Sequence, residues 1–113
     1  MIEGSCHCGA VRLTLPAAPD DLGSCNCSMC RRLGGLLGYY RPDEVNVADP
    51  DGRLVGYVQG DATLTTWHCG ICGCISHWSP RDPAYERMGV NLRLFDPEVW
   101  EPLPRRFIDG ASW

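Results

Sequence analysis

The chain has 113 residues, 44% of them hydrophobic, and a formal net charge of −4 in which all ten basic residues are arginine. This length suits one domain spanning residues 1–113, and the hydrophobic content excludes an intrinsically disordered chain. The acidic balance argues against a nucleic-acid-binding protein, because such proteins usually carry a basic excess.

No apolar stretch approaches the roughly 20 residues that a membrane-spanning helix needs, so no membrane partner is expected. The first residues lack the basic and apolar regions of a signal peptide, which favours a cytoplasmic location. In a reducing compartment, the eight cysteines are better explained as metal ligands than as disulfides.

The 13 glycines and 9 prolines divide the chain into short segments, as is typical of a β-rich fold with many turns. Short strands are expected, in chain order, at residues 9–15, 36–40, 44–47, 54–58, 62–67, 74–78 and 90–95. The predicted fold class is therefore mainly β: a small, metal-stapled domain of short antiparallel strands.

The predicted connections follow from turn residues. A polar loop is expected at residues 16–23, and Ser28 is expected to cap a short helical turn through the middle cysteines. Turns are expected at residues 49–52 and at Gly60-Asp61. The tail, residues 102–113, is expected to be extended and to pack on the surface through Phe107 and Ile108.

The first and third cysteine clusters predict one closed metal site. Cys6 and Cys8 would project from the same face of an extended strand, because alternate side chains of a strand share a face. Cys69-Gly-Ile-Cys72 supplies a second pair, with glycines that let the backbone curl around an ion. Four thiolates form a structural zinc site, which contributes on the order of 10 kcal/mol of folding free energy.

The middle cluster supplies three thiolates within six residues, Cys25, Cys27 and Cys30. A fourth position left to water or substrate is typical of catalytic zinc, and Arg31 and Arg32 would attract an anionic substrate. The alternative is a second structural site completed by Cys74 or His77.

Several other side chains have plainer interpretations. His7 is expected on the surface, His68 and His77 in packing or hydrogen bonding, and Cys74 as a spare buried thiol. Trp67 and Trp78 are expected in the core, with an aromatic wall near a metal as the alternative. Asn91 and Arg93 would share one strand face, which is either solvated or lines a polar pocket.

The motifs Cys6-x-Cys8-Gly-Ala-Val, Cys25-x-Cys27-x-x-Cys30 and Cys69-x-x-Cys72-Gly resemble those of the glutathione-dependent formaldehyde-activating enzyme family, which includes centromere protein V-like proteins. The resemblance implies a β-tent fold with two zinc ions per chain. It implies a structural zinc on Cys6, Cys8, Cys69 and Cys72 and a catalytic zinc on Cys25, Cys27 and Cys30. It also implies carbon–sulfur lyase chemistry between glutathione and formaldehyde.

The resulting hypothesis is a zinc-dependent carbon–sulfur lyase whose partner is a small-molecule thiol or thiol adduct. Its catalytic residues would be Cys25, Cys27 and Cys30, with Asn91 donating to a carbonyl oxygen and Arg93, Arg31 or Arg32 holding a carboxylate. The competing hypothesis is a non-enzymatic, zinc-stapled interaction or redox-sensing module, because an open three-thiolate site also reacts with oxidants.

Overall fold

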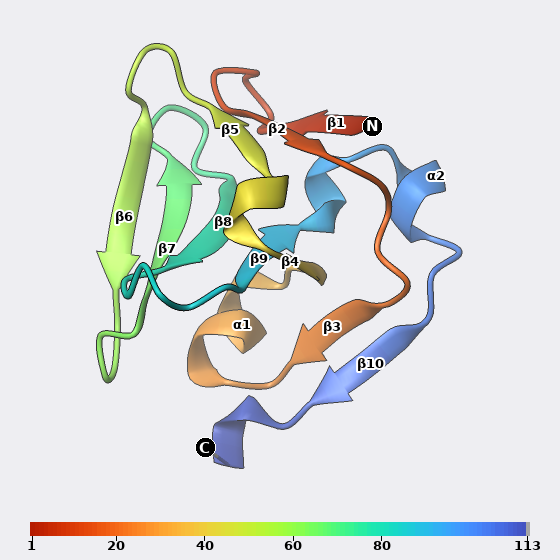
Figure 1. Cartoon of the computed structure of the whole chain (residues 1–113), viewed down its shortest axis with the longest axis vertical. Helices are drawn as coiled ribbons and strands as arrows, with labels where there is room; N and C mark the ends of the chain where they lie inside the picture. The colour runs from red at the N-terminus through yellow and green to blue at the C-terminus, as the bar shows by residue number, and fades with distance from the viewer. Residues whose placement is uncertain (113) are drawn as a thin grey trace.

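The chain is mainly β in the computed structural model, which describes residues 1–112 (Figure 1). Trp113, the end of the tail that was expected to be extended, lies outside the described residues. The strands are β1 (Ile2–Ser5), β2 (Arg12–Leu15), β3 (Leu22–Cys25), β4 (Leu37–Tyr40), β5 (Asn46–Ala48), β6 (Leu54–Val58), β7 (Leu64–Cys69), β8 (Ile75–Pro80), β9 (Met88–Asn91) and β10 (Arg105–Ile108). The helices are α1 (Ser28–Leu33), α2 (Pro97–Trp100) and the 3-10 turns η1 (Pro42–Glu44), η2 (Leu92–Leu94) and η3 (Gly110–Ser112). None of these helices has the length and apolar character needed to cross a membrane.

The strands form two sheets within the described residues. The smaller sheet has the order β1-β2-β5, and the larger has the order β10-β3-β4-β9-β8-β7-β6. The strand pairs are antiparallel except β3 with β10, which is parallel, so the expectation of antiparallel strands does not hold at this edge. The reason is the connection after β9. Because β9 already runs in the direction of β3, and the chain returns through η2 and α2 before β10 begins, β10 runs parallel to β3.

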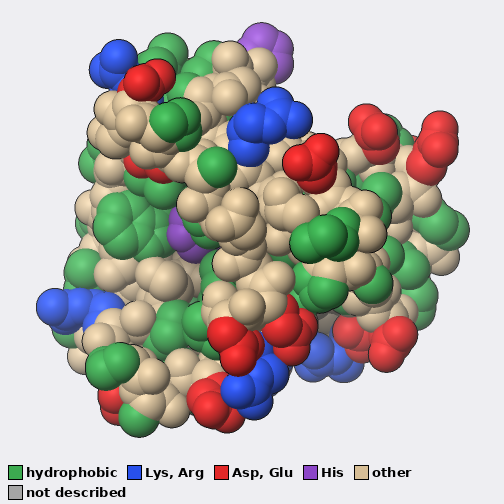
Figure 2. Space-filling model, turned by 45° about the horizontal axis from the view of Figure 1, so that its top comes forward, with side chains coloured by type: hydrophobic (Ala, Val, Ile, Leu, Met, Phe, Trp, Pro, Cys, Tyr) green, Lys and Arg blue, Asp and Glu red, His purple; other side chains and the backbone are tan. Residues whose placement is uncertain are grey.

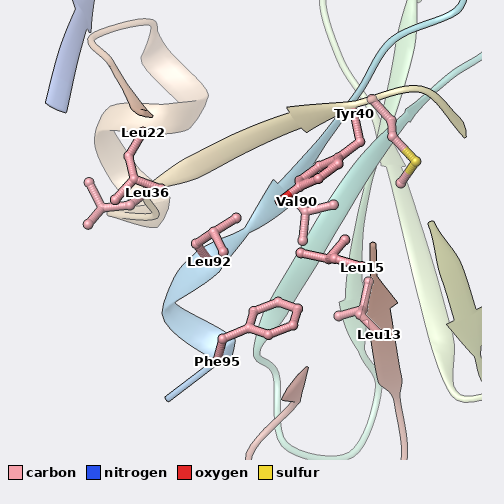
Figure 3. Packing of buried hydrophobic residues seen from close by; sticks show 9 residues of the cluster. Leu13, Leu15, Leu22, Leu36, Tyr40, Val90, Leu92 and Phe95 are labelled. Carbon is pink, nitrogen blue, oxygen red and sulfur yellow. The ribbon is translucent and has the colours of Figure 1, made fainter. Parts of the chain in front are cut away.

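The main hydrophobic core lies between the two sheets. Leu13 and Leu15 of β2 are fully buried and face Val90, Leu92 and Phe95 from the β9–η2 segment (Figure 3). The packing is tight enough to require glycine in β1: a Cβ at residue 4 would lie 2.8 Å from the ring of Phe95. Leu13 and Leu15, apolar residues of the alternating pattern that predicted a strand at 9–15, therefore lie on the side of β2 that faces this core.

A second, smaller cluster lies where the β1–β2 connection meets the β7–β8 connection. Cys6, Val11 and Cys69 are buried in it, and Cys72 and Cys74 pack against them half-buried. Four of its members are cysteines, so sulfur atoms contribute to this core beside the apolar side chains of Ala10, Val11, Val47 and Leu54.

The predicted strands at residues 36–40, 54–58, 62–67 and 74–78 are confirmed to within a few residues by β4, β6, β7 and β8. The turn at residues 49–52 is also confirmed, because the Gly52 N–H donates to the Asp49 carbonyl oxygen at 3.1 Å and Gly52 has a φ of 65°. The loop at 16–23 is two residues too long, since Leu22 begins β3.

The strand predicted at residues 90–95 is wrong beyond Asn91. The Asn91 side-chain oxygen accepts a hydrogen bond from the Arg93 N–H at 3.2 Å, which caps the 3-10 turn η2. Asparagine competes with strand pairing in this way because its side chain can satisfy nearby backbone donors. Asn91 and Arg93 consequently do not share a strand face.

The tail prediction is confirmed only at residues 105–108; it is wrong at residues 110–112, which form the 3-10 turn η3, and in one contact. Residues 105–108 form β10, and Ile108 is half-buried. Phe107 instead has 69% of its surface exposed, because alternate residues of an edge strand point to opposite faces.

Candidate metal centre and cavity

Four cysteine sulfurs from distant parts of the sequence converge on one point. Cys6, Cys8, Cys69 and Cys72 place their sulfur atoms within 4.8 Å of one another, and Cys8 Sγ lies 3.6 Å from both Cys6 Sγ and Cys69 Sγ. The pairing of the first with the third cluster is the one that the sequence predicted. Four sulfurs at this separation form a donor set that suits a tetrahedral zinc ion.

Turns, not a strand face, bring these sulfurs together. Cys6 and Cys8 follow β1 in a turn that Gly9 closes, with the Gly9 N–H donating to the Cys6 carbonyl oxygen at 3.1 Å. The expectation that the two share the face of an extended strand is therefore wrong. On the other side, Gly73 has a φ of 81° and donates to the Cys69 carbonyl oxygen at 2.9 Å. The predicted curl at the glycines of the third cluster is confirmed.

Backbone N–H groups point at these sulfurs and favour thiolates. The N–H groups of Val11 and Ile71 donate to Cys6 Sγ and Cys69 Sγ, each at 3.4 Å. N–H groups of Cys74 and Cys8 lower the pKa of Cys72 to about 5. The Ala10 N–H lowers the pKa of Cys8, but burial and the adjoining thiols outweigh it and raise that pKa to about 11. Like charges cannot all ionise at this spacing, whereas a divalent cation would stabilise four thiolates.

The middle cluster lies where β3 ends and α1 begins. Cys25, Cys27 and Cys30 are half-buried, and their sulfurs lie within 4.8 Å of one another. Cys27 caps α1, because its sulfur accepts the Cys30 N–H at 3.3 Å. The prediction that Ser28 caps this helix is wrong by one residue, since a thiolate can accept a backbone N–H as a hydroxyl does.

The three thiols of the middle cluster have unequal acidity. Burial raises the pKa of Cys27, but the Cys30 N–H and the adjoining thiols outweigh it, so the pKa is lowered. Burial and the charge of Cys27 raise the pKa of Cys30. The cluster thus favours a thiolate at the helix cap and disfavours three thiolates in the absence of a neutralising cation.

The three-thiol cluster opens on a cavity of about 860 Å³. One face of the larger sheet forms much of the wall, because alternate residues of its strands point there: Leu37 and Tyr39 of β4, Leu64 and Thr66 of β7, and Trp78 of β8, which pairs with Thr66. Neither Cys74 nor His77 has a ligand atom within 4.8 Å of all three sulfurs, so within residues 1–112 the cluster has three cysteine ligands.

The structure separates the polar residues that the sequence selected. Asn91 is buried in the cavity wall, and its side-chain N–H donates to the Ile75 carbonyl oxygen at 2.9 Å. Arg93 is exposed with its guanidinium 4.9 Å from the ring centre of Trp100, and it does not line the cavity. Arg31 and Arg32 are exposed on α1 and also lie outside the cavity wall.

Two other arginines occupy the place that the sequence analysis gave to Arg31, Arg32 and Arg93. The guanidinium of Arg87 lies 4.1 Å from the ring centre of Tyr39, that of Arg106 lies 6.0 Å away, and all three residues line the cavity. Arg106 is paired with Asp21 at 3.1 Å, whereas Arg87 has no ion pair within the described residues. No local motif marks either arginine. On the face shown in Figure 2, arginine and acidic side chains lie next to one another and form no basic patch.

The structure confirms some of the surface, packing and hydrogen-bonding roles predicted for the histidines and tryptophans. His7 is exposed, and His77 is buried with its Nδ1 2.7 Å from Ser76 Oγ and its ring stacked on Trp67. Trp67 is half-buried and donates to Ser79 Oγ at 2.8 Å. Trp78 is half-buried as well, but it forms an aromatic wall of the cavity instead of the core.

A family model and a curated relative point to the same family, and a solved structure shares the fold. The family described as glutathione-dependent formaldehyde-activating enzyme matches residues 1–109. A Halomonas elongata protein provisionally named glutathione-dependent formaldehyde-activating enzyme is 33% identical over 99% of this chain and 66% of its own length. The chain thus spans just under two thirds of that relative. A crystal structure of a Rhodobacter sphaeroides protein superposes with a TM-score of 0.75 at 32% identity, covering 93% of this chain and all of the other.

The two clusters predict a specific metal stoichiometry. We expect two metal ions per wild-type chain and one per Cys72→Ser chain, because that change removes one of the four converging sulfurs. Cys74→Ser is the matched control, since its sulfur lies outside both groups, and it should retain two ions. Elemental analysis of the purified proteins measures the count, and thermal unfolding should show a large loss only in Cys72→Ser. Equal metal content in the two variants would contradict this assignment.

The buried imidazole predicts a pH-dependent loss of stability. Burial lowers the pKa of His77 from 6.5 to about 4, so the unfolded chain takes up this proton at a higher pH than the folded chain does. The stabilisation is present above pH 6.5 and is lost as the pH falls toward 4. Between these limits the wild type should lose roughly 3 kcal/mol more unfolding free energy than His77→Gln. Urea unfolding at both ends of this pH range tests it; parallel curves would refute it.

Proposed function

The chain belongs to the glutathione-dependent formaldehyde-activating enzyme family, and from this premise we propose that it is a zinc-dependent carbon–sulfur lyase acting on a small thiol and formaldehyde. The observation that carries the proposal is the three-thiol cluster at the wall of a large cavity. Three protein ligands and an open fourth position are typical of catalytic zinc, whereas structural zinc is closed by four.

The proposal assigns different roles to the two clusters. Cys6, Cys8, Cys69 and Cys72 would hold a structural zinc, and Cys25, Cys27 and Cys30 a catalytic one. Bound zinc at the second cluster would lower the pKa of a substrate thiol and polarise a carbonyl oxygen. A cytoplasmic location forms part of the proposal, because both clusters need reduced thiols.

The reaction is an addition in which no electrons are gained or lost overall. The substrate thiol gives up its proton, its sulfur forms a bond to the formaldehyde carbon, and the C=O π pair moves to the oxygen. That oxygen then takes a proton, which gives a hydroxymethyl thioether, and the reverse sequence expels the thiolate. The protein must therefore hold the thiol, exclude water and move one proton.

Apolar side chains and fixed amides suit the cavity to this task. Leu33, Leu37 and Ile75 line it beside the three cysteines and would exclude water from the reacting sulfur. The Asn91 amide is held by its bonds to Ile75 and Arg93, which leaves one side-chain N–H for a carbonyl oxygen. A role for Arg93 would require it to leave its position over Trp100.

Arg87 is the best-placed group for binding a carboxylate of the thiol substrate. It lines the cavity, and within residues 1–112 no acidic side chain pairs with it. Tyr39 supports its guanidinium through a cation–π contact at 4.1 Å, which fixes the position of the charge. Glutathione, the thiol named by the family, carries carboxylates that such a guanidinium would bind in a bidentate manner.

Turnover of glutathione and formaldehyde tests the proposed activity. We expect the metal-loaded wild type to accelerate formation of the hydroxymethyl thioether and Cys27→Ser to lose at least about 10²-fold in kcat, because one thiolate of the open cluster is gone. Serine retains an oxygen that can cap α1, so helix loss does not explain the effect. NMR with ¹³C-formaldehyde follows both directions. Turnover unchanged in Cys27→Ser would contradict the scheme, and no turnover with both metals bound would favour the non-enzymatic module.

Replacing Arg87 should affect charged and neutral thiols differently. For Arg87→Met we expect the KM for glutathione to rise by about tenfold or more, because a charge-assisted contact is lost. The KM for 2-mercaptoethanol, which has no carboxylate, should stay within about twofold. Arg105→Met is the matched control, since this residue is exposed on β10 outside the cavity. A selective rise in Arg93→Met instead would support the residue chosen from the sequence.

A further inference from the structure

We propose that the cavity contains a carboxylate site with two donors, in which the indole N–H of Trp78 and the guanidinium of Arg87 hold the same carboxylate of the thiol substrate. This inference rests on the proposed function and deepens it, because it adds a residue that selects thiols bearing a carboxylate. The sequence predicts Trp78 in the core or in an aromatic wall and assigns no task to its N–H.

Trp78 lies on the face of the larger sheet that lines the cavity. It pairs with Thr66 of β7 and with Gly89 of β9, and Gly89 in turn pairs with Tyr39 of β4. Directly paired residues share a face of a sheet, and Thr66, Trp78 and Tyr39 all line the cavity. Val90, the neighbour of Gly89, is buried in the main core on the opposite face. The indole therefore belongs to the cavity side.

The indole lies across Gly89. A Cβ at residue 89 would lie 2.1 Å from Trp78 Nε1 and 2.7 Å from each of the ring atoms bonded to it, Cδ1 and Cε2. Because these two atoms are only slightly farther away than Nε1, the Cβ would meet the face of the ring and not its N–H edge. The N–H bond thus runs along the surface of the sheet, at the position that a side chain of residue 89 would fill.

This N–H has no acceptor within residues 1–112, where no buried side-chain nitrogen or oxygen lacks a hydrogen-bond partner. Trp78 is half-buried, so its Nε1 is one of the atoms that remain accessible, on the cavity side. The N–H groups of Trp67 and Trp100 instead donate to Ser79 Oγ at 2.8 Å and to the Phe95 carbonyl oxygen at 3.0 Å. A largely enclosed indole N–H usually has an acceptor, and here a ligand in the cavity would supply it.

The guanidinium of Arg87 lies beside this N–H in the same row of the sheet. Its Cζ is 4.1 Å from the ring centre of Tyr39, and the rings of Tyr39 and Trp78 form a tilted pair with 6.4 Å between centres and 58° between planes. Since Gly89 and Tyr39 are directly paired, their Cα atoms are about 5 Å apart. One donor therefore lies over Gly89 and the other over the ring of its partner.

A carboxylate is the group that fits this pair of donors. Its two oxygens offer about four acceptor positions, of which a bidentate arginine takes two, so an N–H beside the arginine can use a third. The negative charge compensates the guanidinium, and the N–H fixes the plane of the carboxylate. A thiol without a carboxylate would leave both donors unused.

The other charged groups of the cavity wall suit a carboxylate less well than Arg87 does. Arg106 is paired with Asp21 at 3.1 Å, so its charge is already compensated. Asp61 and Asp82 are exposed and accept loop N–H groups. Arg87 and the N–H beside it are therefore the best-placed donors for an incoming carboxylate.

Kinetics of Trp78→Phe test the role with glutathione and formaldehyde as the probe pair. We expect the KM for glutathione to rise by about tenfold with kcat within about twofold, because a charge-assisted hydrogen bond is lost while the ring is kept. The KM for 2-mercaptoethanol should stay within about twofold. Gly89→Ala keeps the N–H but displaces it, so it should raise the same KM. Trp67→Phe is the matched control, since this half-buried indole lies across Gly56 and does not line the cavity.

A double-mutant cycle tests whether the two donors share one carboxylate. In the Arg87→Met chain, the further change Trp78→Phe should raise the KM for glutathione by less than about threefold, because the carboxylate is no longer held beside the indole. Independent effects of the two changes, each of full size in the presence of the other, would contradict the shared site.

A second readout does not depend on turnover. In metal-loaded protein with ¹⁵N-labelled indoles, the Trp78 N–H resonance is assigned by its absence in Trp78→Phe. Glutathione should shift it downfield, and 2-mercaptoethanol should not. The N–H resonances of Trp67 and Trp100 should stay in place, because their acceptors lie within the protein.

The outcomes separate this inference from the proposed function. Turnover of glutathione with an unchanged KM in Trp78→Phe and Gly89→Ala would overturn the role of Trp78 and leave the lyase proposal standing. A downfield shift of the Trp78 N–H by glutathione without any turnover would support the carboxylate site and overturn the lyase. Absence of both turnover and shift would overturn both proposals, and a selective rise in KM together with the shift would support both.

Discussion

Repulsion between closely spaced sulfurs is the constraint on which the rest of the molecule depends. Cys8 and Cys69 are 61 positions apart, yet their sulfurs lie 3.6 Å from each other. Thiolates at that distance repel, so the arrangement persists only if some sulfurs stay protonated or a cation neutralises them. A cation bound there would link the turn after β1 to the turn after β7. It would thereby connect the small sheet to the large one at the smaller hydrophobic cluster.

The cavity, in contrast, adjoins a group of three sulfurs, one fewer than a closed tetrahedral metal site needs. β3 and α1 deliver three thiols to the face of the larger sheet on which β8 presents Trp78 and β4 presents Tyr39. Because residues two apart share a face of a strand, each strand adds to the wall without breaking its pairing. The same thiol that would bind a metal, Cys27, also begins the helix. One side chain thus both caps the helix and belongs to the candidate metal site.

Much of the site could be predicted, and the failures have physical causes. The grouping of Cys6 and Cys8 with Cys69 and Cys72 follows from ligand spacing, and so does the separate group at Cys25, Cys27 and Cys30. Spacing did not reveal that the first pair sits in a turn, because a turn and a strand can both aim residues i and i+2 at one ion. It also misled at Asn91, where alternation predicted a strand and a side-chain cap ended it.

The sequence by itself determined the mainly β class, the short elements and the two groups of cysteines, since these depend on residue type and on spacing over a few residues. Only the tertiary structure decided which polar residues surround the open cluster. Arg87, Arg106 and Tyr39 meet at the cavity because β10 pairs in parallel with β3 and β4 lies on the other side of β3. Arg93 lies outside the cavity, because β9 ends at Asn91 and the following 3-10 turn places Arg93 over Trp100. Strand order and strand ends are set by packing across the whole sheet, and no local pattern encodes them.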